Sequence, residues 1–310
     1  MFSVIFPGQG SQSVAMGKNL YDKYDFVKKL FSRADDILGY SISKIILEGP
    51  KETLDNTENT QAAIFLVSYS IFETVKRESK INLQNAKYFA GHSLGEYSAL
   101  AASNSLTFDN AIMLLKERGK AMQAAVPKGQ GGMLAVLGTE INNINEILKN
   151  NKNKYECFIA NDNSNGQVVL SGNLKDIDLL IEDLNSTSIK NIKLPVSAPF
   201  HCKLMRSATE IMKQKIVETN FKDPDNPIIS NVTAKETKNS NEIKELLIKQ
   251  IESPVKWRES VLYMIENGIK KFIEIGPGKV LSGLIKRIDR SVELISINDI
   301  DDLKKFNLND

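Results

Sequence analysis

The chain has 310 residues, of which 42% are hydrophobic and 25% charged, and 40 basic against 38 acidic residues leave a formal net charge of +2. This composition is ordinary for a globular protein of one large or two unequal domains, and the balanced charge argues against a nucleic-acid partner. No apolar stretch approaches the roughly 20 residues of a membrane helix, and no basic leader opens the chain, so we expect no membrane partner and a cytoplasmic location.

The first third of the chain alternates between strand and helix patterns. We expect a buried strand at Phe2–Phe6, helices over residues 21–38 and 60–77, a strand at Lys87–Gly91, and helices over residues 94–103 and 109–125. Strands that alternate with helices are typical of a mainly parallel sheet with helices on both faces. The sequence therefore predicts the α/β class.

The pattern changes after a glycine-rich loop at residues 127–132. Strands are expected over residues 133–138, 155–162, 167–172 and 189–197, and helices over residues 140–150 and 173–186. This β-α-β-β-α-β order is typical of a ferredoxin-like unit. We interpret residues 126–198 as a small domain inserted into a larger one, which consists of residues 1–125 and 199–310.

The larger domain then resumes. We expect strands at Pro227–Asn231, Lys270–Gly276 and Val292–Ile297, a helix at Ile243–Ile251 and another that opens after Gly278. The tail from Asp299 onward is polar, and we expect it to be frayed.

The segment Gly91-His92-Ser93-Leu94-Gly95 fits the pattern G-x-S-x-G between a predicted strand and a predicted helix. Such a turn exposes a nucleophilic serine, and its glycines let other backbone approach closely. The amides at the start of the helix favour a developing oxyanion. The alternative interpretation is a tight structural turn.

A nucleophilic serine needs a base, and the chain has two histidines. His92 is adjacent to Ser93, and neighbouring residues of a strand point to opposite faces, so His201 is the remaining candidate. The alternative interpretation is that His201 is a solvated loop histidine without a catalytic role. With two histidines and two cysteines, Cys157 and Cys202, and without a CxxC or HExxH spacing, we expect neither a metal site nor a disulfide.

Two polar residues lie on apolar helix faces. Arg118 follows Leu114 by four residues and precedes Met122 by four, and a buried guanidinium needs an anionic partner. The residues alone favour a protein carboxylate, because structural ion pairs are common, over a substrate carboxylate. Gln250 ends its helix on the buried face, either as a helix-end hydrogen bond or as a wall of an active site.

Several segments together resemble the malonyl-CoA:acyl carrier protein transacylases. The similar segments are FPGQGSQ, GHSLGEYSAL, the helix of Arg118, NDNSNGQVVLSG, LPVSAPFH, QIESPVKW and FIEIGPG, in the order of that family, from Phe6 to about Ile285. The resemblance implies an α/β-hydrolase-like large domain with a parallel sheet and an inserted ferredoxin-like small domain. It implies malonyl transfer from malonyl-CoA to the phosphopantetheine thiol of holo acyl carrier protein, as an extender unit for fatty acid synthesis, without a bound cofactor.

The resemblance also implies roles for individual residues. Ser93 corresponds to the nucleophile and His201 to its general base, which the backbone carbonyl of Gln250 orients in place of an acidic third member. Arg118 corresponds to the residue that pairs with the malonyl carboxylate. Main-chain amides of Gln9 and Leu94 correspond to the oxyanion hole, and Phe200, directly before the histidine, goes with malonyl rather than methylmalonyl choice. We expect a monomer.

Three alternatives stay open. A serine hydrolase would use water as the acceptor, a degenerate relative would only dock carrier protein, and a polyketide acyltransferase would differ in its carrier. Cys202 lies beside His201, so thiol modification of Cys202 is a hypothesis for inhibition.

Overall fold

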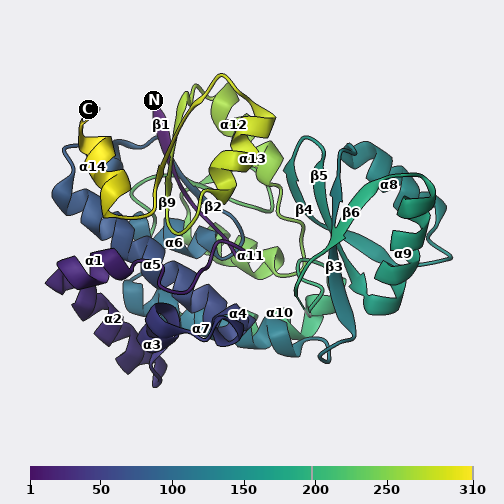
Figure 1. Ribbon diagram of the computed structural model, residues 1–310, viewed down its shortest axis with the longest axis horizontal. Coiled ribbons are helices and arrows are strands. Elements are labelled where there is room, and N and C mark those ends of the chain that lie inside the picture. Colours follow the sequence, from purple (N-terminus) through teal and green to yellow (C-terminus); the bar gives the residue numbers. More distant parts are fainter. Residues whose placement is uncertain (197, 309–310) are drawn as a thin grey trace.

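The computed structural model describes residues 1–196 and 198–308, and its fold is built on two β-sheets. Figure 1 shows the larger sheet with most of the helices on one side of the molecule, and the smaller sheet with two helices at the other end of the long axis. Among the described residues the larger sheet has six strands in the order β10-β9-β1-β2-β7-β8. These strands are β1 (Phe2–Phe6), β2 (Tyr88–Gly91), β7 (Ile228–Ile229), β8 (Glu236–Thr237), β9 (Lys271–Ile275) and β10 (Glu293–Ile297).

Neighbouring strands of the larger sheet pair in parallel, except that β8 runs antiparallel to β7 at one edge. Parallel strands need crossover connections, and the helices between the strands supply them, while α14 follows the last strand. The helices of this part are α1 (Lys18–Lys23), α2 (Asp25–Leu38), α3 (Ile42–Glu48), α4 (Lys51–Asp55), α5 (Thr57–Glu78), α6 (Gly95–Ala102), α7 (Phe108–Ala124), α10 (Arg206–Glu218), α11 (Ser240–Gln250), α12 (Trp257–Glu266), α13 (Val280–Ile288) and α14 (Ile300–Leu308), with short 3₁₀ helices at Leu83–Asn85 and Lys203–Met205.

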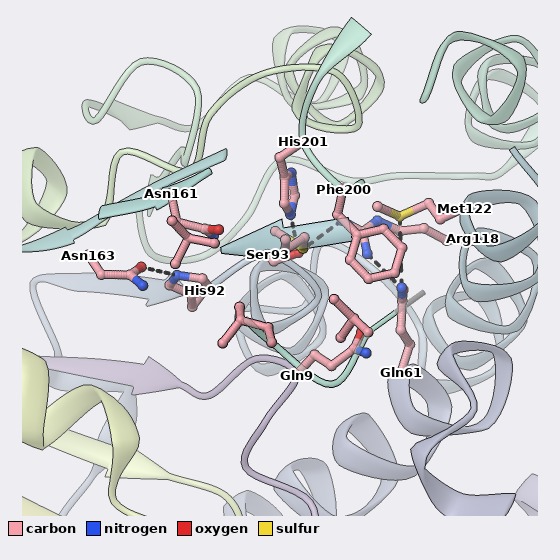
Figure 2. Close-up of a pocket in the computed structure, with 14 residues that line it drawn as sticks. Gln9, Gln61, His92, Ser93, Arg118, Met122, Asn161, Asn163, Phe200 and His201 are labelled. Atoms are coloured by element: carbon pink, nitrogen blue, oxygen red, sulfur yellow. Dashed lines mark hydrogen bonds between the residues drawn. The ribbon is translucent and has the colours of Figure 1, made fainter. Parts of the chain in front are cut away.

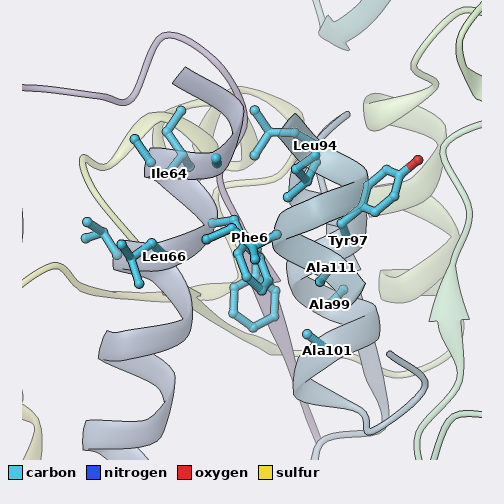
Figure 3. Close-up of a cluster of buried hydrophobic side chains, with 14 of the residues drawn as sticks. Phe6, Ile64, Leu66, Leu94, Tyr97, Ala99, Ala101 and Ala111 are labelled. Carbon is cyan, nitrogen blue, oxygen red and sulfur yellow. The ribbon is translucent and has the colours of Figure 1, made fainter. Parts of the chain in front are cut away.

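Successive side chains of β1 point to opposite faces of the sheet and enter different cores. Val4 and Phe6 belong to the core that α2, α5, α6 and α7 cover, whereas Ile5 belongs to the core under α12 and α13. Figure 3 shows Phe6 between α5, which carries Ile64 and Leu66, and the helix that carries Tyr97. Helices on both faces explain why the central strands read as continuous apolar runs.

The smaller sheet has four antiparallel strands in the order β4-β5-β3-β6. The elements are β3 (Gly131–Leu137), α8 (Ile141–Asn150), β4 (Cys157–Ser164), β5 (Gln167–Asn173), α9 (Leu174–Ser186) and β6 (Lys190–Lys193). This order and connectivity are those of a ferredoxin-like unit. The predicted fold class, an α/β-hydrolase-like part with a parallel sheet plus an inserted ferredoxin-like unit, is confirmed.

Strand β4 joins the two parts of the molecule. Asp162 N donates to the carbonyl of Val255 over 3.0 Å, and Val255 N donates to the carbonyl of Ala160 over 2.8 Å. Next to this bridge, Arg258 of α12 forms an ion pair with Asp162, Nη2 to Oδ2, over 2.9 Å. These contacts fix β4, which carries Asn161, against the larger part.

Some predicted elements differ from the structure. The helix predicted over residues 21–38 breaks between α1 and α2 at Tyr24, which has an extended backbone. Two predicted strands are shorter, at β6 and β7, and the predicted end of the former, Ser197, lies outside the described residues. The prediction of a frayed tail was wrong for residues 300–308, where α14 forms because Ile300, Leu303 and Phe306 are buried against the core, and the end of that tail, residues 309–310, lies outside the described residues. Helices α3, α4, α10 and α12 were not predicted.

None of the helices in residues 1–196 and 198–308 combines the length and the apolar character that crossing a bilayer requires.

Candidate active site

Ser93 lies on a sharp turn between β2 and α6 with a backbone φ of 53°, in the left-handed region that is costly for serine. Close packing of the turn requires the flanking glycines. A Cβ on Gly91 would lie 2.0 Å from the backbone of Gly95, and a Cβ on Gly95 would lie 2.3 Å from the carbonyl oxygen of Phe6. The strained turn therefore tolerates neither side chain, and it presses directly against the end of β1.

Asn231, which follows β7, holds this turn in place. Its Oδ1 accepts a 2.7 Å hydrogen bond from the backbone amide of Ser93, and its Nδ2 donates over 2.7 Å to the carbonyl of Gly91. Asn231 is fully buried. The side chain thus pairs two backbone groups that the turn would otherwise leave unsatisfied, and this offsets part of the backbone strain.

The Ser93 hydroxyl and the imidazole of His201 lie within hydrogen-bonding distance, with 2.8 Å between Oγ and Nε2. The other ring nitrogen, Nδ1, lies 2.9 Å from the carbonyl oxygen of Gln250. Because a carbonyl only accepts, Nδ1 carries the proton and Nε2 is the free base that faces the serine. Figure 2 shows His201 above Ser93 in the pocket.

Burial, and next the positive charge of Arg118, lower the pKa of His201 to about 3. The imidazole is therefore neutral near neutral pH and able to accept the serine proton. His201 also has a φ of 58°, so Ser93 and His201 are both held in strained backbone conformations. His92 instead places its Nε2 2.8 Å from Oδ1 of Asn163.

Arg118 of α7 is fully buried and directs its guanidinium at the serine. Nη2 lies 3.1 Å from Oγ of Ser93 and 2.9 Å from Oε1 of Gln250, and Nη1 lies 2.7 Å from Oε1 of Gln61. These acceptors are neutral, so the expectation of a protein carboxylate bonded to Arg118 was wrong for the part of the chain that the structure describes. A buried cation with neutral partners next to a nucleophile is suited to an anionic ligand.

A buried carboxyl group lies behind these residues. Oε2 of Glu96 accepts hydrogen bonds from Nε2 of Gln250 over 2.8 Å and from the backbone amide of Asn231 over 3.1 Å. Burial raises the pKa of Glu96 to about 7, although these two bonds and the charge of Arg118 act in the opposite direction. Sequence reasoning missed Glu96, Asn231 and Gln61. The lone carboxyl in the helix GEYSALAA was the one available signal for Glu96.

The loop after β1 completes the front of the site. A Cβ on Gly8 would lie 2.6 Å from the carbonyl oxygen of His92, so this loop lies directly on the serine turn. Gln9 and Ser93 line one cavity of about 140 Å³, and Leu94, the residue before α6, already has helical dihedral angles. The cavity is lined by Gln9, Gln61, His92, Ser93, Arg118, Met122, Met133, Asn161, Asn163, Val169, Leu194, Val196, Phe200 and His201.

The structure brings the sequence-predicted residues Ser93, His201, Arg118, Phe200 and Gln9 to this one cavity. Gln250 lies directly behind it, through its contacts with His201 and Arg118. Cys202 is buried, its Sγ lies 3.1 Å from the carbonyl of Pro199, and burial raises the pKa of its thiol to about 11. This burial argues against the hypothesis that Cys202 is readily modified.

Comparison with known proteins gives consistent results. Residues 3–303 match the model of the acyl transferase domain family. The chain is 42% identical over 297 residues to the malonyl CoA-acyl carrier protein transacylase of Bacillus subtilis, with 95% of this chain and 92% of that one covered. It is 39% identical over 310 residues to the protein of the same name from Staphylococcus aureus, with 99% of each chain covered.

Solved structures resemble the chain over its whole length. The acyl-carrier-protein-S-malonyltransferase of Bartonella henselae superposes with a TM-score of 0.95 at 36% identity, covering 98% of both chains. A malonyl-transacylase solved in complex with its type II PKS acyl-carrier protein superposes with a TM-score of 0.94 at 34% identity, covering 100% of this chain and 99% of that one.

Proposed function

The chain belongs to the acyl transferase domain family, as a relative of the malonyl CoA-acyl carrier protein transacylases, and from this premise we propose that Ser93 carries the malonyl group between two thiols. The overall activity is that of an acyltransferase that moves a malonyl group to acyl carrier protein. The observation that supports these residue roles is that Ser93 contacts His201 on one side and the buried guanidinium of Arg118 on the other.

In the first half of the reaction, Oγ of Ser93 attacks the thioester carbonyl of malonyl-CoA while Nε2 of His201 takes the hydroxyl proton. The carbon–sulfur bond then breaks, and His201 returns the proton to the sulfur of coenzyme A. In the second half, the phosphopantetheine thiol of holo acyl carrier protein gives its proton to His201 and attacks the malonyl-serine. The ester bond breaks and Oγ regains the proton.

Three further contacts support this proposal. The carbonyl of Gln250 accepts from Nδ1 of His201 and stabilises the imidazolium that forms in each half-reaction. Backbone amides of Gln9 and Leu94 would receive the oxyanion, since the loop of Gln9 lies against the start of α6. Arg118 would bind the malonyl carboxylate. Phe200, which is buried at the cavity wall, would limit the space at the α-carbon and favour malonyl over a branched acyl group.

The proposal extends to the whole molecule. Each step uses side chains and backbone amides of this chain, so no resident cofactor is assigned. We assign residues 126–198 to the inserted domain and the remaining residues to the catalytic domain. The working unit is a monomer in the cytoplasm that supplies extender units for fatty acid synthesis.

The test is the intact mass of the protein after brief incubation with malonyl-CoA, beside acetyl-CoA and a Ser93→Ala variant. We expect a malonyl adduct that maps to Ser93, is much weaker with acetyl-CoA, disappears when holo acyl carrier protein is added and is absent from the variant. Rapid thioester loss without an adduct would indicate a hydrolase. An unmodified protein with intact malonyl-CoA would indicate a protein that only docks its carrier.

A further inference from the structure

Helix α6 carries one carboxyl group, Glu96, among buried small and apolar residues, and only 2% of Glu96 is exposed. Burying a carboxylate is costly unless it is well paired. Its hydrogen-bond donors within the described residues are neutral, namely the amide side chain of Gln250 and the backbone amide of Asn231. Packing alone does not account for such a group, because an apolar residue of the same size would avoid the cost of desolvation.

The two partners of Glu96 are the residues that hold the reacting groups. Gln250 accepts from Arg118 with its side chain and from His201 with its backbone carbonyl. Asn231 pairs with the amide of Ser93. Glu96 is therefore one residue removed from the nucleophile, the base and the guanidinium.

Glu96 also helps to set which way the Gln250 amide points, together with the carbonyl of Ser93, which accepts from Nε2 of Gln250 over 3.2 Å. A carboxylate only accepts hydrogen bonds, so it faces the NH₂ end of the amide and leaves Oε1 of Gln250 for Arg118. The reverse orientation would place Oε1 against the carboxylate and the NH₂ group against the guanidinium. Both contacts would then be repulsive, so an ionised Glu96 holds Arg118 in its place.

We propose that Glu96 is a positioning residue whose carboxylate balances the charge of Arg118 in the unloaded site and, through Gln250, sets the guanidinium to receive the malonyl carboxylate. This inference rests on the proposed pairing of Arg118 with malonyl. Glu96 then influences the choice of acyl group without touching the substrate. When malonyl enters, its carboxylate bonds to the guanidinium, on which Glu96 acts through its charge and through Gln250, whereas an acetyl group leaves this arrangement undisturbed.

This arrangement makes the preference for malonyl depend on pH. The charged or titratable side chains that act on Glu96 are Arg118 from α7 and Tyr97 from α6 itself, and α11 contributes the neutral side chain of Gln250. Burial raises the pKa of Tyr97 to about 12, so Tyr97 is neutral near neutral pH. Glu96, with its pKa of about 7, therefore changes charge in this range.

The direction of the effect follows from the charge that Glu96 places near Arg118. Below pH 7 Glu96 is protonated, Arg118 lacks a counter-charge, and a malonyl carboxylate is bound more favourably. Above pH 7 the ionised Glu96 offsets part of the charge of Arg118, so the guanidinium attracts the malonyl carboxylate less strongly. The ratio of kcat/KM for malonyl-CoA to kcat/KM for acetyl-CoA should therefore fall as pH rises through 7, by about tenfold if malonyl shifts the pKa of Glu96 by about one unit.

The experiment measures this ratio between pH 5.5 and 8.5 for the wild type, Glu96→Gln, Glu96→Asp and Arg118→Ala. Because one oxygen, Oε2, accepts both hydrogen bonds, Glu96→Gln keeps them and removes only the charge. We expect Glu96→Gln to have a constant ratio near the wild-type value at low pH. Glu96→Asp keeps the charge on a shorter side chain, so we expect it to keep the pH dependence with a lower kcat.

The outcomes separate the two proposals. If Arg118→Ala retains its preference for malonyl, the proposed role of Arg118 is wrong, and the inference about Glu96 is wrong with it. If Arg118→Ala loses the preference but Glu96→Gln shows the wild-type pH dependence, only the inference about Glu96 is overturned.

A calorimetric measurement covers the case in which the Glu96 variants do not fold. Malonyl-CoA or acetyl-CoA is titrated into the Ser93→Ala chain near pH 7 in two buffers of different ionisation enthalpy. We expect net proton uptake with malonyl-CoA and none with acetyl-CoA. Equal proton uptake with the two thioesters would overturn the proposal.

Discussion

Replacing Arg118 with alanine tests whether the buried guanidinium recognises the malonyl carboxylate or only supports the serine. A hydrogen bond to a charged group contributes about 1.5–3 kcal/mol, and the planar guanidinium can present two donors to one carboxylate. Taking about 3 kcal/mol for the pair, kcat/KM for malonyl-CoA should fall by about 100-fold. The acetyl group has no carboxylate, so its kcat/KM should change by less than about tenfold.

The structure also shows what else the substitution disturbs. Oε1 of Gln61 and Oε1 of Gln250 lose a buried donor, and each unpaired acceptor costs about 1–3 kcal/mol of stability. The melting temperature is therefore measured before the kinetics. Arg118→Lys is the matched control: it keeps a positive charge without the planar fork, so it should recover only part of the lost selectivity.

The assay is the initial rate of acyl-enzyme formation with each thioester, followed by intact mass under single-turnover conditions. A loss that is equally large for malonyl-CoA and acetyl-CoA would refute the reasoning. In that case Arg118 would act through its contact with Ser93 and through the pKa of His201, not through recognition of the carboxylate.

Three further predictions concern the surroundings of the site. Asn231→Ala leaves the amide of Ser93 and the carbonyl of Gly91 unpaired. We therefore expect the free energy of unfolding, measured in urea, to fall by about 2 kcal/mol and acylation to be at least about tenfold slower. An unchanged acylation rate would contradict the role of Asn231. Because the pKa of Glu96 is raised in the folded state, ionisation of Glu96 destabilises the folded wild type at pH values above its pKa in the unfolded chain, and Glu96→Gln has no such group. The unfolding free energy of Glu96→Gln should therefore rise relative to that of the wild type by about 3 kcal/mol between pH 4.5 and 7. A constant difference in unfolding free energy would show that Glu96 is not buried as described. Iodoacetamide at pH 8 should leave the folded protein active with Cys202 unlabelled, whereas rapid labelling on mass spectrometry would show that the buried, high-pKa thiol is accessible.

Local sequence patterns accurately predicted the strands and turns that position the active-site residues. The strand Phe2–Phe6 and the serine turn depend on neighbouring residues, because a buried strand reads as an apolar run and a tight turn needs glycine. The tail after Asp299 was harder to predict. Its few apolar residues form a helix because they pack against the core, and the local composition does not predict that tertiary contact.

The sequence by itself determined that the chain alternates between strands and helices, that a serine lies on a glycine-flanked turn, and that an arginine is placed on an apolar helix face. These features follow from spacing along a short segment. Only the tertiary structure decided what Arg118 touches. The residues alone favoured a protein carboxylate as the partner of Arg118, whereas the fold provides Gln61, Gln250 and Ser93 as acceptors. The side chain of Gln250 separates Glu96 from Arg118. Such contacts join segments that are far apart in the chain, so they depend on how the sheet and its crossovers bring those segments together, which no local pattern records.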